Sequence, residues 1–156
     1  MRVLRGLIRH EEGPVRQRAV EAIGRNKLRD AALDLFARME ERGFHQLPVA
    51  ERRAVMQTSC QVAEEEGEAA LVKLVASHGM VANEELDASR LVAVDVLKTT
   101  ALTDAALEAT RDAARRRWWN TKELQDAAAA AVPVIEQRLR DLDAELVRRG
   151  RTIGEA

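Results

Sequence analysis

The sequence has few of the residues that build β-sheets. It contains no tyrosine, two phenylalanines and two tryptophans among 156 residues, and only three prolines. Strands favour aromatic and β-branched residues, whereas Ala, Leu, Glu and Arg, which are abundant here, favour helices. The scarcity of strand formers therefore predicts an all-α fold.

Cysteine and long apolar runs are also scarce. Cys60 is the only cysteine, so the chain can form no internal disulfide, which fits a reducing compartment. No apolar run approaches the roughly 20 residues that cross a bilayer, and no signal-peptide pattern opens the chain. We therefore expect a cytoplasmic protein that does not enter a membrane.

Charge of one sign is not in excess. The chain carries 25 basic and 26 acidic residues, for a formal net charge of −1. Nucleic-acid binders usually carry a basic excess, because phosphate contacts supply much of their affinity. The composition therefore disfavours a dedicated nucleic-acid binder and leaves open a local basic patch.

One tetrapeptide, an acidic residue followed by Ala-Ala-Leu, recurs along the chain. Its copies at residues 30–33, 68–71 and 104–107 are 38 and 36 residues apart. We interpret the acidic residue as favourable at a helix start, the alanines as allowing a second helix to lie close, and the leucine as filling the groove between the two. Helix pairs of this size cannot bury their apolar faces alone, so the copies are expected to stack. The period predicts an α-solenoid of stacked antiparallel helix pairs, with about seven or eight helices.

The expected helices follow from apolar periodicity and from capping residues. Gly67 is expected to end the fourth helix. The three glutamates at residues 64–66 form the last turn of that helix, and we interpret them as a solvated face, with a site for a cation or a basic partner as the alternative. Thr103 and Thr121 are expected N-caps, and Pro133 is expected to kink or break the last helix. The predicted helices cover residues 2–10, 13–24, 28–42, 48–66, 68–78, 85–100, 103–117 and 121–149, with a linker at 43–47.

The two ends of the chain differ from the middle. Residues 2–10 read as the second helix of a repeat, so they are either an N-terminal cap or part of a longer solenoid. In the last helix, Ile135, Leu139, Leu142 and Leu146 are spaced by four, three and four residues. This spacing favours an amphipathic end cap, with a coiled-coil seam as the alternative. Residues 1–156 are expected to form a single domain.

A family resemblance rests mainly on residues 4–33. The pattern is Leu4, Leu7, Ile8, the His-Glu-Glu turn at 10–12, Val15-Arg16, Ala19, Ala22-Ile23-Gly24 and Ala31-Ala32-Leu33. It resembles bacterial HEAT repeats of the phycobilisome-lyase-like subtype. The resemblance implies stacked helix pairs in a curved right-handed superhelix and says little about function.

Residues that could support catalysis are few. His10, His45 and His78 are far apart, and Cys60 has neither a second cysteine nearby nor a polar setting, so we interpret it as a core residue. No glycine-rich phosphate loop is present. We therefore expect a protein that is not an enzyme and has no cofactor or metal site.

The most unusual stretch is Arg-Arg-Arg-Trp-Trp-Asn at residues 115–120. The arginines suit the negative end of a helix dipole. Neighbouring residues of a helix point about 100° apart, so Trp118 and Trp119 cannot both face one core. One tryptophan is expected to pack between repeats and the other to be partly exposed, where Trp and Arg often anchor partners. The alternative is a nucleic-acid site, in which arginines contact phosphates and a tryptophan stacks on a base.

Three functions remain open from the sequence. The first is a scaffold that binds an unidentified protein partner through the second helix of each pair. The second is nucleic-acid binding on a HEAT-like scaffold, similar to the scaffold that some DNA glycosylases use. The third is a tetrapyrrole lyase or chaperone, because the repeat subtype that the chain resembles is named after such proteins. Candidate partner-binding residues are Asp34, Arg38, Lys73, His78, Glu108, Arg111, Arg115, Trp118 and Trp119.

Overall fold

The chain folds into α-helices joined by short turns. The computed structural model describes residues 2–155, and side chains of residues 2–150. This part of the chain contains eight α-helices, two short 3-10 helices and no strand, so the predicted all-α class is confirmed. The helices are α1 (Arg2–Leu7), α2 (Gly13–Arg25), η1 (Arg29–Ala31), α3 (Ala32–Glu40), η2 (Arg42–Gln46), α4 (Val49–Val62), α5 (Glu64–Ala76), α6 (Glu84–Thr100), α7 (Asp104–Ala114) and α8 (Lys122–Glu155).

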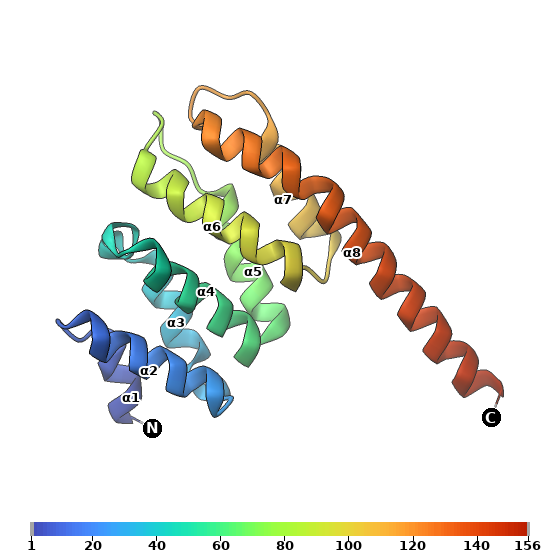
Figure 1. Ribbon diagram of the computed structural model, residues 1–156, viewed down its shortest axis with the longest axis horizontal. Coiled ribbons are helices and arrows are strands. Elements are labelled where there is room, and N and C mark those ends of the chain that lie inside the picture. Colours follow the sequence, from blue (N-terminus) through green and yellow to red (C-terminus); the bar gives the residue numbers. More distant parts are fainter. Residues whose placement is uncertain (1, 156) are drawn as a thin grey trace.

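The helices lie in two layers. In the first layer α2 packs on α4, α4 on α6, and α6 on α8, while α3, α5 and α7 pack in sequence in the second layer (Figure 1). The core lies between the layers, where Ile23, Leu35, Met56, Leu71 and Leu97 are fully buried. Segments about 36 residues apart in sequence are therefore neighbours in space.

The repeat seen in the sequence is shifted in its first copy. Leu33 was predicted to fill the groove between helices, but its side chain is 74% exposed, whereas Leu71 and Leu107 are buried. The buried leucine next to the first copy is Leu35, which precedes Leu71 by 36 residues, as Leu71 precedes Leu107. The prediction failed because Leu33 lies in the first turn of α3, directly after η1, where it points away from the core.

The prediction that Gly67 ends a helix was wrong. α4 ends earlier, at Val62, because the Ala63 backbone leaves the helical region (φ −151°, ψ 84°), and α5 begins at Glu64. Gly67 lies inside α5 against the backbone of α4: a Cβ there would be 2.7 Å from the Ser59 carbonyl oxygen and 2.8 Å from the Cys60 Cα. Glycine is needed at this position for the close approach of two helices.

The same boundary changes the interpretation of the glutamates at 64–66. They open α5 instead of closing the preceding helix, so they lie at the positive end of its dipole. Their charge is therefore favourable to the helix that contains them. The predicted linker at 43–47 also differs, because most of it forms η2 and buries the Phe44 side chain completely.

The last helix is longer than predicted and is not broken. α8 is continuous from Lys122 to Glu155 through Pro133. Pro133 is exposed, whereas Ala131 and Ile135 on either side of it are buried against the other helices. Packing on both sides of the proline holds the helix together where its ring removes one backbone hydrogen bond.

The two predicted threonine caps behave differently. Thr121 precedes α8, and its Oγ1 accepts a hydrogen bond from the Leu124 N–H (3.3 Å), so it caps the helix as expected. Thr103 precedes α7 but makes no side-chain capping bond. Its hydroxyl donates instead to the buried Glu68 carboxylate, which also accepts the Leu102 N–H and so ties α5 to the α6–α7 turn.

Candidate binding surface at the loop edge

Four loops form one edge of the molecule. They connect α1 to α2, α3 to α4, α5 to α6 and α7 to α8, at residues 8–12, 41–48, 77–83 and 115–121 (upper left in Figure 1). Side chains join neighbouring loops: Arg9 Nε donates to Glu41 Oε1 at 2.6 Å, and the His78 ring stacks on Trp119. We call this surface the loop edge.

The most distinctive feature of the loop edge is an aromatic cluster on its last two loops. The rings of His78 and Trp119 are stacked, with centroids 4.6 Å apart and planes 17° apart. Trp118 meets Trp119 edge-to-face at 5.1 Å, and the Arg117 guanidinium lies 5.4 Å from the Trp119 ring centroid. These contacts hold Trp119 in place, while the Trp118 side chain remains 64% exposed.

Three cationic side chains share a pocket with the exposed tryptophan. An open pocket of about 830 Å³ is lined by Trp118 together with Arg116, Arg117 and Lys122. Asp126 is the one carboxylate among its lining residues, so the pocket carries a net positive charge. Asp112 forms ion pairs with two arginines of this loop, Arg115 at 3.5 Å and Arg117 at 3.8 Å.

A buried arginine fixes the loop that carries the tryptophans. The Arg90 side chain of α6 is 2% exposed and donates to the Val75 carbonyl (2.8 Å), the Asp87 carboxylate (2.9 Å) and the Asn120 side-chain oxygen (2.8 Å). Asp87 in turn accepts the Thr121 N–H at 2.7 Å. The loop at 115–121 is therefore anchored to α6 immediately after the two tryptophans.

The three histidines lie on the same edge but in separate loops. His10 accepts the Glu12 N–H at 3.1 Å, and His45 lies 2.8 Å from the Ser89 hydroxyl. Burial, aided by the charge of Arg52, lowers the pKa of His45 below its usual value, so this ring stays neutral near pH 7. Among the described residues, no group of three or more His, Cys, Asp or Glu side chains could hold a metal ion.

The charged residues proposed from the sequence are engaged in separate ion pairs. Asp34 pairs with Arg5, Lys73 with Glu40, and Arg38 with Glu41. Arg111 pairs with both Glu108 (3.2 Å) and Glu136 (3.0 Å). These pairs are spread along α3, α5 and α7 and do not form one cluster. Of the proposed residues, Glu108 and Arg111 form an ion pair, and His78, Trp118 and Trp119 form one aromatic cluster.

Sequence reasoning missed part of this surface. Lys122 lines the pocket beside Trp118, and Met80 and Val81 are strongly exposed on the loop that carries His78. The exposed apolar pair in a short polar loop was a signal that the sequence offered. The contact between His78 and Trp119 had no such signal, because it joins residues of two different loops that are far apart in sequence.

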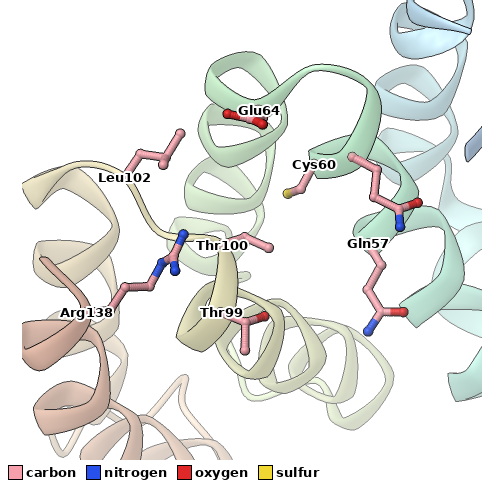
Figure 2. Close-up of a pocket in the computed structure, with 8 residues that line it drawn as sticks. Gln57, Cys60, Glu64, Thr99, Thr100, Leu102 and Arg138 are labelled. Atoms are coloured by element: carbon pink, nitrogen blue, oxygen red, sulfur yellow. The ribbon is translucent and has the colours of Figure 1, made fainter. Parts of the chain in front are cut away.

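A second pocket lies at the opposite ends of the helices. It has a volume of about 510 Å³ and a lining of mixed polar and apolar surface, in which Gln57 and Cys60 of α4 face Thr99 and Thr100 of α6 and Arg138 of α8 (Figure 2). Cys60 is only 6% exposed, and burial raises the pKa of its thiol to about 11. The sulfur is therefore protonated near neutral pH, which agrees with a core residue and not with a nucleophile.

This environment predicts slow thiol chemistry. In the folded protein at pH 8, Cys60 is expected to react with an aromatic disulfide reagent far more slowly than a free cysteine, because less thiolate is present and the sulfur is covered. In denaturant it should react at the rate of a free thiol. Reaction at the free-thiol rate without denaturant would show that Cys60 is accessible and ionised.

Comparison of the chain with protein-family models, with curated proteins and with solved structures finds no match. In the described part of the chain no helix is both long and apolar enough to cross a membrane.

Proposed function

We propose that the protein is a non-catalytic binding module, built as an α-solenoid of HEAT-like repeats, that holds a protein partner at the loop edge. The observation that carries this proposal is Trp118, a large side chain that is 64% exposed and lines a pocket with three cationic side chains. Tryptophan and arginine are the residues most enriched where alanine scanning finds strong contributions to binding. A preformed surface also loses little entropy when it binds.

The solenoid part of the proposal is supported by helix packing. Each first-layer helix packs on the helix two positions later in the chain, and Leu35, Leu71 and Leu107 recur at 36 residues in buried positions. Such nearest-neighbour packing is the hallmark of repeat proteins, which present long continuous surfaces. Here one of those surfaces is the loop edge.

The chemistry of the loop edge favours an acidic partner segment that carries an apolar side chain. Arg116, Arg117 and Lys122 attract carboxylates, while Trp118 and the exposed Met80 of the adjacent loop offer apolar contact. Arg117 already forms an ion pair with Asp112. The cations best placed to bind a partner are therefore Arg116 and Lys122.

Single-stranded nucleic acid is the second candidate ligand. The stack of His78, Trp119 and Arg117 resembles the aromatic and cationic platforms on which bases stack, and Trp118 presents an exposed indole beside it. The formal net charge of −1 and the pairing of Arg115 and Arg117 with Asp112 weigh against strong phosphate binding.

Tryptophan emission provides a direct test, because the only tryptophans of the chain are both in this cluster. We would titrate the protein with an acidic peptide containing leucine and with an oligothymidylate, and capture partners from cell extract with and without nuclease. Trp118→Ala and Arg116→Glu are the test variants. Leu33→Ala is the matched control, since Leu33 is also strongly exposed (74%) but lies on α3.

For the protein-binding function we expect capture of a nuclease-insensitive partner and a change in emission with the acidic peptide. Both should be lost in Trp118→Ala and kept in Leu33→Ala. Binding that disappears with nuclease, together with a change in emission on oligothymidylate, would favour the nucleic-acid function. Equal capture by all three variants would contradict a binding site at the loop edge.

A further inference from the structure

The pocket at the helix ends opposite the loop edge has walls from four helices. Its lining comes from α4, from the start of α5, from the end of α6 with the turn that follows, and from the middle of α8 (Figure 2). Its volume of about 510 Å³ lies within the range of about 300–1,000 Å³ that is usual for small-molecule sites. No aromatic ring is among the described residues that line it. The pocket therefore suits a small polar molecule better than an aromatic one.

An arginine is held in position at this pocket. The Arg138 guanidinium points into it from α8, and its Nε donates to the Ala101 carbonyl at 2.7 Å (Figure 2). Among the side chains that the structure describes, Arg138 has no carboxylate partner, whereas Arg140, two residues further along α8, is paired with Glu136. The planar fork of an arginine binds a carboxylate through two parallel hydrogen bonds. The terminal nitrogens of Arg138 therefore favour a ligand that carries a carboxylate.

The same pocket also offers hydrogen-bond acceptors. Glu64, the first residue of α5, lines it, and its carboxylate has no ion pair or hydrogen bond within the described part of the chain. The hydroxyls of Thr99 and Thr100 donate to the Val96 carbonyl, at 3.2 and 2.9 Å, so their oxygens can still accept. A carboxylate and two accepting hydroxyls are suited to an ammonium group, which has three N–H donors and no acceptor.

Two glutamines on α4 complete the lining. Gln57 and Gln61 are four residues apart, so they lie on one face of the helix, and both line the pocket. Neither side-chain amide forms a hydrogen bond to another described residue. Because an amide can both donate and accept, this pair matches a ligand group that does the same, such as a second amide or a hydroxyl.

We propose that this pocket binds a free amino acid with a polar side chain. Arg138 binds the α-carboxylate, and the ammonium group lies toward Glu64 and the threonine oxygens. Gln57 and Gln61 bind the side chain of the ligand. The site shares no residue with the loop edge, so it stands independently of the function proposed above.

The charges of the lining favour a zwitterion over other small anions. Arg138 and Glu64 contribute one charge of each sign, and the other lining residues are uncharged. A ligand with one carboxylate and one ammonium group pairs with both charges, whereas a phosphate dianion would pair with Arg138 and be repelled by Glu64. Gln57, Glu64 and Thr99 are exposed, so the ligand stays partly in water. We therefore expect a dissociation constant between roughly 10 μM and 1 mM.

Isothermal titration calorimetry of the full chain with L-glutamine tests the site. Two derivatives each remove one charge: N-acetyl-L-glutamine has no ammonium group, and L-glutaminamide has no carboxylate. Each should bind at least about tenfold more weakly than L-glutamine, because each loses a charge-assisted hydrogen bond. L-leucine, which is of similar size, should also bind more weakly. Tryptophan emission should not change, because both tryptophans lie at the loop edge.

Two pairs of variants assign the charges. Arg138→Gln should lower the affinity for L-glutamine at least about tenfold, whereas Arg140→Gln on the same helix should leave it unchanged. Glu64→Gln should also lower it, with Glu65→Gln as the control from the same helical turn. Neither Arg140 nor Glu65 lines the pocket. Glu64→Gln should leave the affinity for N-acetyl-L-glutamine unchanged or raise it, because that ligand has no ammonium group to lose a partner.

The possible results separate clearly. Binding of L-glutamine that needs both of its charged groups, and that Arg138→Gln and Glu64→Gln weaken while their controls do not, supports the proposal. Absence of binding up to about 10 mM L-glutamine overturns it. Tighter binding of inorganic phosphate than of L-glutamine, or equal binding of the two derivatives and L-glutamine, overturns the assignment to an amino acid. Circular dichroism shows whether each variant is folded, and Glu64→Gln, at an exposed position, keeps the test valid if Arg138→Gln is not.

Discussion

Gly67→Ala is expected to lower the free energy of unfolding by at least about 2 kcal/mol, although alanine is the better helix former. The added Cβ would lie 2.7 Å from the Ser59 carbonyl oxygen and 2.8 Å from the Cys60 Cα, which are backbone atoms. Backbone cannot rotate aside as the end of a flexible side chain can, so α4 and α5 must move apart. In a domain of this size the melting temperature should fall by roughly 2–4 °C for each kcal/mol.

Gly6→Ala is the matched control for this substitution. Gly6 also lies inside an α-helix, but a Cβ there would meet no atom within 4 Å. Its replacement should leave stability unchanged or raise it by up to about 1 kcal/mol, because alanine favours the helix. Urea unfolding followed by circular dichroism measures both variants. Equal stability of the two would mean that α4 and α5 are not in close contact at Gly67.

Arg90→Met is expected to cost about 3–5 kcal/mol, the usual range for removing one partner of a buried ion pair. The Asp87 carboxylate would remain buried with the Thr121 N–H but without its cation, and the Val75 carbonyl and Asn120 would lose a donor. The variant should also loosen the loop at 115–121. We expect the tryptophan emission to shift toward longer wavelength at urea concentrations below the main transition.

Arg53→Met provides the comparison for the buried arginine. Arg53 forms an ion pair with Asp95, but both side chains are about one-third exposed, so water can replace the lost contact. Exposed ion pairs contribute about 0–1 kcal/mol, and this variant should fall in that range. A similar loss in the two variants would contradict the structural role assigned to Arg90.

The helix boundaries illustrate how far the sequence could be interpreted. Apolar periodicity predicted the ends of most helices to within a few residues of their observed positions. It could do so because a helix buries one face, and the spacing of the apolar residues on that face is visible in a short stretch of sequence. Gly67 was misassigned because glycine ends helices in many proteins, and nothing nearby in the sequence indicates that another backbone passes beside it. The boundary at Ala63 has no glycine or proline to mark it.

The candidate binding surface could also be predicted only in part. The sequence singled out Trp118 and Trp119 because two adjacent tryptophans cannot share a core, and the structure places one exposed and the other half-buried on His78. The charged residues proposed with them were chosen by register alone. The register of a helix predicts on which side a charged residue lies, but it does not predict which side chain of another helix pairs with that charge. The ion pair of Asp34 with Arg5 could therefore not be predicted.

The sequence by itself determined the all-α class, because helix propensity and apolar spacing act over a few residues of one chain segment. The tertiary structure alone decided why Gly67 must be glycine and that His78 meets Trp119. Each of these depends on segments that lie more than one helix apart in sequence or on the exact rotation of a helix against its neighbour. A shift of one or two residues turns a helix face by 100° or more, and only packing between the layers fixes that rotation.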